Sequence, residues 1–201
     1  MSNGKRRTFK ELMDAAISSL SERSQEIVRA RFGVSGKSCT LNEIGNNYGI
    51  TRERVRQIIK ESVNKVQKQE NDGILEEARV DIKCTIKNNN DIIHREEILN
   101  LYGDDLNERG SVEFFLECLE DVNVVEKKGE IAKSFMDHKF DIDYWKEIKD
   151  AAKATLNKKK ETLDSEGFYQ EFKSEFGDNF NVTEGEFLNY LKVSGLAVSG
   201  K

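Results

Sequence analysis

The side chains best suited to recognition chemistry lie close together in the stretch "TRERVRQIIK", residues 51–60. Four of them carry hydrogen-bonding groups of complementary kinds: Arg52, Glu53, Arg56 and Gln57. An arginine can donate two parallel hydrogen bonds to the acceptor pair of guanine, and a glutamate can accept one from the amino group of cytosine. The types of these residues therefore favour contact with the edges of DNA bases.

The spacing of these residues predicts a helix with two different sides. At about 100° per residue, the four polar residues and Lys60 fall on one side. The opposite side is a stripe made by Val55, Ile58, Ile59, Ser62 and Val66. A plain amphipathic helix with a solvated charged face would show the same pattern, so the neighbouring sequence has to separate the two interpretations.

The residues before this helix predict a shorter helix and a tight turn. Thr40 is a good N-cap, and Glu43 lies three residues later, where it can complete a capping box. Gly45 allows a second helix to cross closely, and Gly49 suits the left-handed position at which a helix ends. Thr51 can cap the following helix. Two caps and two glycines at this spacing are typical of a helix-turn-helix.

Two further helices are expected before this pair. Apolar residues recur at helical spacing from Phe9 onward, and Ser21 can cap a helix that stops at Gly33. We expect a four-helix unit over residues 8–70 that folds on its own, after a disordered tail over residues 1–7. Its predicted core is Phe9, Leu12, Ile17, Ile27, Val28, Phe32, Leu41, Ile44, Tyr48, Ile50, Val55, Ile58, Ile59 and Val63.

One long stretch, "LSERSQEIVRARFGVSGKSCTLNEIGNNYGITRERVRQIIKESVNKVQ", resembles region 4 of the sigma-70 family of bacterial transcription initiation factors. It is most similar to the primary, housekeeping type, whose pattern contains "RFG", "TLEEIG" and "TRERVRQIE". Two positions depart from that pattern. Ile59 stands where the family usually has glutamate, and the sequence after Lys60 reads "ESVNKVQKQE" in place of the basic "KALRKLR". The second departure removes positive charge, so we expect weaker binding to phosphates than in the family.

The resemblance implies that this helix-turn-helix recognises the minus-35 promoter element of double-stranded DNA in the major groove. By position, it assigns Arg52, Glu53, Arg56 and Gln57 to base edges or nearby phosphates. It assigns contacts with the DNA backbone to Arg23, Arg31, Thr40, Thr51, Arg54 and Lys60. The family's region 4 also docks on the flap of the RNA polymerase β subunit through apolar residues of its first helices.

The charge of the chain is unevenly distributed. Residues 1–70 carry fourteen Lys and Arg against eight acids, a net of +6. From totals of 32 bases and 37 acids, the remaining residues hold eighteen bases and 29 acids, a net of −11. A basic first part suits phosphates, whereas the acidic remainder suits a protein partner or self-association. No apolar run approaches a membrane span and no signal-peptide pattern opens the chain, so we expect a cytoplasmic, nucleoid-associated protein.

The acidic remainder predicts two winged-helix-like domains. After a linker at residues 71–73, helical patterns followed by a short hairpin predict one such domain over residues 74–136. A similar order of apolar positions recurs over residues 141–201. The second domain stops where a last strand is expected and could be truncated. The expected fold is thus mostly α, with a four-helix sigma region 4-like head followed by two winged-helix repeats.

Neither a cofactor nor a catalytic centre is expected. Cys39, Cys84 and Cys118 have no paired spacing, which disfavours a disulfide framework or a zinc site. The glycines of "GVSGKS" are too close together for a phosphate loop. "HREE" at residues 94–97 lacks a second pair of metal ligands, and "YGDDLNE" lacks the carboxylate and lysine set of a nuclease.

The sequence therefore predicts a noncatalytic, sequence-specific DNA-binding transcription regulator. No stretch resembles the promoter-melting regions 2 and 3 of the family, so we do not expect a complete sigma factor. Two alternatives remain open. The head could occupy the polymerase flap as an adaptor or competitor of sigma, or the chain could be the DNA-targeting subunit of a restriction or defence enzyme.

Overall fold

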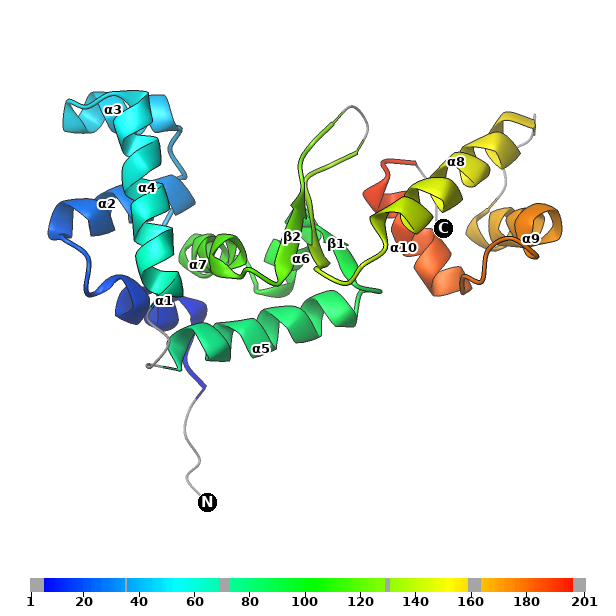
Figure 1. The fold of residues 1–201 in the computed structure, drawn as a ribbon, viewed down its shortest axis with the longest axis horizontal. Coiled ribbons are helices and arrows are strands. Elements are labelled where there is room, and N and C mark those ends of the chain that lie inside the picture. The colour runs from blue at the N-terminus through cyan, green and yellow to red at the C-terminus, as the bar shows by residue number, and fades with distance from the viewer. Residues whose placement is uncertain (1–5, 35, 69–72, 129–130, 159–163, 197–201) are drawn as a thin grey trace, which may run out of the picture. The chain divides into compact units, whose positions relative to one another are not determined.

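The computed structural model describes residues 6–34, 36–68, 73–128, 131–158 and 164–196. These residues are mostly helical, as predicted. The helices are α1 (Phe9–Ile17), α2 (Glu22–Phe32), α3 (Leu41–Tyr48), α4 (Arg52–Gln67), α5 (Ile74–Lys87), α6 (Arg95–Leu101), α7 (Leu106–Cys118), α8 (Ile142–Lys158), α9 (Ser165–Phe176) and α10 (Glu184–Val193) (Figure 1). The strands are β1 (Ile92–His94), β2 (Val122–Val125) and β3 (Ser134–Asp137).

Two compact units divide the chain, and each is built from two segments. Unit 1 comprises residues 1–84 and 98–120, and unit 2 comprises residues 85–97 and 121–201. Helices α5 and α6 each contribute residues to both units. Residues 1–5, most of the predicted tail, lie outside the described residues.

The first two helices of unit 1 are joined by a charged cluster at their partly buried side. The Asp14 carboxylate accepts hydrogen bonds from Lys10 at 2.7 Å and from Arg29 at 2.9 Å. Burial by itself raises the pKa of Asp14, but the hydrogen bonds from Lys10 and then Arg29 outweigh it and leave the pKa below its ordinary value. Asp14 therefore stays charged at neutral pH and links α1 to α2.

Helix α7 packs against α1 and α2 inside unit 1. The rings of Phe9 and Phe115 meet edge to face at 5.9 Å between centroids, and those of Phe32 and Phe114 do so at 5.4 Å. A Cβ added at Gly110 would lie 2.2 Å from the carbonyl oxygen of Phe32, so only glycine fits at this crossing. The first helices of the predicted head thus bury their apolar side against a helix more than seventy residues further along the chain.

Two contacts with charged groups reinforce this arrangement. The Glu108 carboxylate accepts hydrogen bonds from the backbone N–H groups of Phe9 and Lys10 at 2.7 and 3.0 Å. These are first-turn donors of α1 that lack a partner inside the helix, and a negative charge there also suits the helix dipole. In the same unit, Arg7 at the end of the predicted tail pairs with Glu77 of α5.

The compact units divide the chain differently from the predicted domains. The prediction placed residues 8–70 and 74–136 in separate domains, whereas residues 73–84 and 98–120 share unit 1 with the head. Most of α7 is buried, with Gly110, Ser111, Val112, Phe114, Phe115, Leu116 and Cys118 inside, and only a narrow stripe with Leu106 and Glu117 is exposed. A helix buried over most of its surface needs several neighbours, and the local pattern does not say which helices supply them.

The strands of unit 2 form one antiparallel sheet in the order β1-β3-β2. Ile93 lies opposite Phe135, which in turn lies opposite Val124. Strands β2 and β3 agree with the short hairpin predicted for the domain over residues 74–136, whereas β1 was not predicted. The two winged-helix repeats stay a prediction, and residues 197–201, where the turn before the expected last strand of the second lies, are outside the described residues.

The remaining helices of unit 2 pack around aromatic side chains. Trp145 of α8 is buried, and its indole N–H donates to the carbonyl oxygen of Tyr190 at 3.2 Å. Phe168 and Phe172 of α9 are buried against Phe187 of α10. These side chains belong to one hydrophobic core.

Candidate nucleic-acid interface

The turn between α3 and α4 is fixed by local interactions. Thr40 and Glu43 form the predicted capping box: the backbone N–H of Glu43 donates to the Thr40 hydroxyl at 3.2 Å, and that of Thr40 donates to the Glu43 carboxylate at 2.7 Å. The backbone hydrogen bond from Thr40 lowers the pKa of Glu43. A Cβ at Gly45 would lie 2.7 Å from the carbonyl oxygen of Ile50, so the crossing requires glycine. Gly49 ends α3 with φ of 64°.

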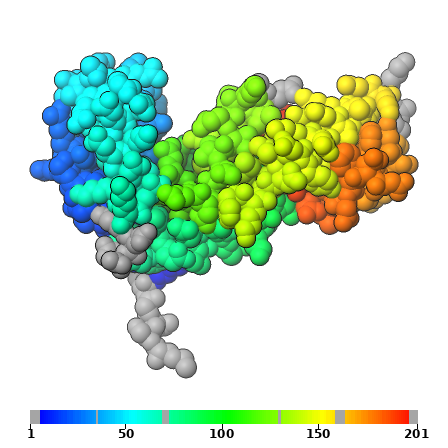
Figure 2. Space-filling view, in the orientation of Figure 1, coloured from blue at the N-terminus to red at the C-terminus, as the bar shows by residue number. Residues whose placement is uncertain are grey.

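Helix α4 has the two sides that the sequence predicts. Its inner side is formed by the buried residues Val55, Ile59, Ser62 and Val66. All four candidate base readers are exposed: Arg52, Glu53, Arg56 and Gln57. In the space-filling view, α3 and α4 (cyan) form an open part of the surface of unit 1 (Figure 2). The helix that follows the turn therefore presents its hydrogen-bonding side outward, which is the requirement for insertion into a groove.

Two of the candidate base readers already form a pair. The guanidinium of Arg56 donates two hydrogen bonds to the Glu53 carboxylate, at 2.9 and 2.6 Å. The hydrogen bond from Arg56 lowers the pKa of Glu53, and the same contact raises the pKa of Arg56. Both groups are therefore charged at neutral pH and are held on one side of the helix with two donors beside two acceptors. Such a pair can exchange its internal hydrogen bonds for a guanine or cytosine edge.

The candidate backbone-contacting residues lie in the helix-turn-helix itself and in α2. Thr40, Thr51 and Lys60 are exposed, and Arg31 is half-buried. The hydroxyl of Thr51 accepts a hydrogen bond from the backbone N–H of Arg54 at 3.1 Å and so caps α4. The role of each as a phosphate contact stays a prediction.

Arg23 has a structural contact that the sequence did not indicate. Its guanidinium donates to the carbonyl oxygen of Tyr48 at 2.9 Å and lies over the Tyr48 ring at 6.0 Å. This carbonyl belongs to the last residue of α3, where helix carbonyls lack internal partners. Arg23 thus stabilises the end of α3, and replacing it would change the helix-turn-helix as well as any phosphate contact.

Glu61 is a residue near the interface that the sequence prediction missed. One carboxylate oxygen lies 3.7 Å from the Arg54 guanidinium, which also donates to the side-chain oxygen of Gln57 at 3.3 Å. The sequence could have indicated this contact, because two residues seven positions apart lie two turns apart on one face of a helix. An acid therefore lies beside a candidate phosphate-binding arginine.

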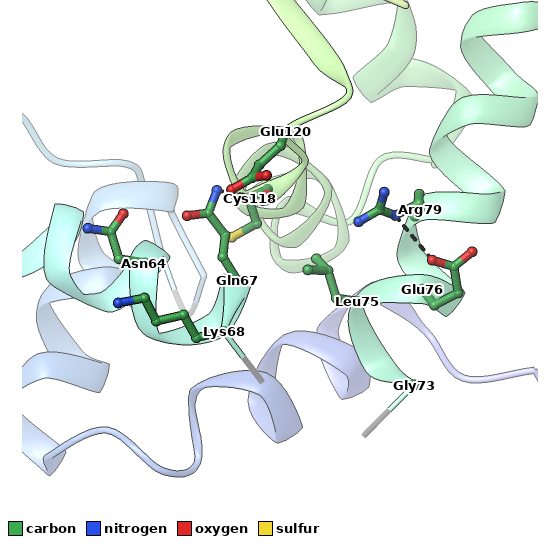
Figure 3. Close-up of a pocket in the computed structure, with 9 residues that line it drawn as sticks. All are labelled: Asn64, Gln67, Lys68, Gly73, Leu75, Glu76, Arg79, Cys118 and Glu120. Carbon is green, nitrogen blue, oxygen red and sulfur yellow. Dashed lines mark hydrogen bonds and ion pairs between the residues drawn. The ribbon is translucent and has the colours of Figure 1, made fainter. Parts of the chain in front are cut away.

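A hollow of about 580 Å³ lies within unit 1 near the C-terminal end of α4 (Figure 3). Several of its polar groups contact one another. The side chain of Gln67 donates to the carbonyl oxygen of Cys118 at 3.1 Å, and Arg79 pairs with Glu76 at 3.1 Å. Burial raises the pKa of the Cys118 thiol, which therefore stays protonated and is not a nucleophile at neutral pH. This hollow contains none of the candidate DNA-binding residues.

The described residues show neither a candidate metal site nor a candidate membrane span. Among them, no group of three or more His, Cys, Asp or Glu side chains is placed to hold a metal ion. None of the described helices has the length and apolar character needed to cross a membrane.

The side chain of His94, in the "HREE" stretch, accepts a hydrogen bond from the backbone N–H of Glu96 at 3.1 Å.

The capped helix pair, its glycine crossing and the outward polar side of α4 define a helix-turn-helix DNA-binding domain. Comparison with known proteins agrees: the family model "Sigma-70, region 4" matches residues 16–68, so this part of the chain is similar to region 4 of the sigma-70 family. A curated relative, the RNA polymerase sigma factor SigA of Bacillus sp, is 39% identical over 60 residues, 29% of this chain. The match spans only 16% of that relative's length. No solved structure matches the chain.

Proposed function

We propose that the protein is a noncatalytic transcription regulator that binds double-stranded DNA in a sequence-specific manner. The observation that carries the proposal is the outward polar side of α4, on which Arg52, Glu53, Arg56 and Gln57 are exposed together. The N-terminal turn of the same helix adds the positive end of the helix dipole. A minus-35-like promoter element is the proposed target, because the match to region 4 covers this helix.

The burial of the first helices favours DNA over the polymerase flap as the main partner. The resemblance assigns flap docking to apolar residues of these helices. In this chain Leu12, Met13 and Ile27 are buried, and Phe9 and Phe32 pack against α7. A flap could reach these side chains only after unit 1 had opened, whereas the polar side of α4 needs no such change.

The test is a binding titration with two duplexes of equal length, one carrying a minus-35-like element and one with the same bases scrambled. We expect tighter binding to the first at every salt concentration, with affinities for both falling as salt rises. Equal affinities throughout would contradict sequence reading, although a salt dependence would still demonstrate phosphate contact.

A single substitution separates phosphate contact from base reading in this assay. Lys60 is exposed on α4, so Lys60→Ala should weaken binding to both duplexes by the same factor and make the salt slope shallower by about 0.9. A loss confined to the minus-35-like duplex would instead show that Lys60 reads bases. Lys60 is a better choice for this purpose than Arg23, which also holds the end of α3.

The alternative, binding to RNA polymerase, is tested by a retention assay. Immobilised protein is incubated with RNA polymerase core enzyme in the absence of DNA, and the retained core is quantified against a bead control. We expect no retention above that control. Retention in the absence of DNA would favour the adaptor or competitor role.

A further inference from the structure

The contact between Arg54 and Glu61 lies at the rim of a small cleft in unit 1. The cleft encloses about 220 Å³ and is lined by residues from the start of α2, from the turn before α4 and from α4 itself. Its polar lining consists of Ser21, Arg23, Ser24, Arg54 and Glu61. Four of these five side chains can donate hydrogen bonds, and Glu61 alone brings a negative charge.

The donors in this cleft suit an anionic oxygen. Guanidinium groups and serine hydroxyls are common ligands of DNA phosphates. The hydroxyls of Ser21 and Ser24 are hydrogen-bonded to each other at 2.9 Å, so one of their two protons remains for such an oxygen. Glu61 weakens the binding of such a ligand in two ways. Its charge repels the phosphate, and its carboxylate, which lies 3.7 Å from the Arg54 guanidinium, competes for that donor.

The Arg54–Glu61 pair is open to solvent and can be exchanged for another contact. The two side chains are 52% and 68% exposed. Exposed pairs of this kind contribute little to folding, so the fold does not explain why an acid stands here. A phosphate that approaches Arg54 has to compete with Glu61 for the same donor.

We propose that Glu61 attenuates DNA binding by competing with a backbone phosphate for Arg54. The inference rests on the proposed function, since it concerns Arg54, a residue assigned to the DNA backbone. Phosphate contacts carry no sequence information, so this competition lowers affinity for every sequence by a similar factor. The competition shortens the time that the protein spends on nonspecific DNA. Discrimination between DNA sequences is left to Arg52, Glu53, Arg56 and Gln57.

The test removes the competing charge and measures affinity for both duplexes across salt. Glu61→Gln should tighten binding to each duplex by about two- to fivefold at moderate salt, because one exposed ion pair no longer competes. The salt slope should steepen by about 0.9, as expected for one added phosphate contact. The ratio of the two affinities should stay unchanged.

Two companion variants make the test specific. Asp104→Asn removes the same charge from an exposed position in the loop between α6 and α7, and should leave both affinities unchanged. Glu61→Gln combined with Arg54→Gln should lose most of the gain relative to Arg54→Gln alone, because the two residues act through one contact.

The outcomes separate this inference from the proposed function. If the unmodified protein prefers the minus-35-like duplex but Glu61→Gln binds no tighter than Asp104→Asn, the inference fails and the function stands. If the gain persists in full without Arg54, Glu61 acts by general repulsion and the competition is refuted. If neither the unmodified protein nor Glu61→Gln binds any duplex, both fail.

Discussion

Helices α4 and α7 belong to the same unit, yet their side chains meet different surroundings. Helix α4 has 16 residues and buries one stripe, with Val55 and Ile59 inside and Arg52 and Arg56 exposed. Helix α7 has 13 residues and is buried over most of its circumference, with Phe114 and Phe115 fully enclosed and only a narrow stripe with Leu106 and Glu117 exposed. A helix with one buried stripe can offer its other side to a ligand, whereas a helix that is mostly enclosed serves mainly the core.

This difference bears on the acidic part of the chain. In the predicted winged-helix domain over residues 74–136, α7 is the third helix and precedes the hairpin. Its packing against α1 and α2 leaves only a narrow outward stripe with Leu106 and the acid Glu117, which does not suit a DNA groove. The acidic composition led to the same expectation that DNA contact belongs to the head. Substitutions in α7 should therefore alter folding, and substitutions on the outer side of α4 should alter binding.

The largest effect is expected from Phe114→Ala. The ring is fully buried and packs against Phe32 and Phe115, so its removal leaves a cavity and should lower the free energy of unfolding by about 3–5 kcal/mol. Urea denaturation followed by circular dichroism measures the change. Leu106→Ala, at the 60% exposed start of α7, is the control and should stay within about 0.5 kcal/mol. Similar losses of unfolding free energy for both variants would contradict the burial of Phe114.

Gly110→Ala tests the close approach of α7 to α2. The new Cβ would lie 2.2 Å from the carbonyl oxygen of Phe32, and the shift needed to relieve this should cost about 1–3 kcal/mol of unfolding free energy. Gly185→Ala in α10 meets nothing within 4 Å and should be neutral or stabilising, since alanine favours a helix. Thermal unfolding of both variants measures these changes. A Gly110→Ala variant as stable as the unmodified protein would contradict the close approach of α7 to α2.

On α4, Arg56→Ala should act on binding and leave folding unchanged. Loss of a bidentate donor should weaken binding to the minus-35-like duplex by about 1–3 kcal/mol and reduce the preference over the scrambled duplex. Because Arg56 and its partner Glu53 are exposed, the unfolding free energy should change by less than about 0.5 kcal/mol. Equal weakening for both duplexes would mean that Arg56 contacts phosphate only.

The smallest effect is expected from Thr40→Ala, which removes the cap of α3. The loss of this capping box should cost about 1 kcal/mol of unfolding free energy. Thr183→Ala removes the equivalent capping box of α10 in unit 2 and should cost a similar amount. Only Thr40→Ala should also weaken DNA binding, because α3 supports α4. Weaker binding in both variants would point to a general loss of folded protein.

Much of the candidate interface could be predicted from the sequence because its determinants are local. The capping box of Thr40 and Glu43, the close crossing at Gly45 and the left-handed Gly49 all act within a few residues. The stripe of α4 follows from helical periodicity alone. These features established the helix-turn-helix, and with them the side of α4 on which the candidate base readers lie.

Other features depend on residues that are distant in sequence. Glu108 holds the N-terminus of α1 at a separation of 99 residues, and Arg23 holds the end of α3 at a separation of 25. No local pattern joins such partners, since apolar and charged groups are compatible with many neighbours until the chain has folded. The sequence therefore determined which helix presents a hydrogen-bonding side. Only the tertiary structure decided that α7 completes the core beneath that helix, because the faces that meet are chosen by shape and burial.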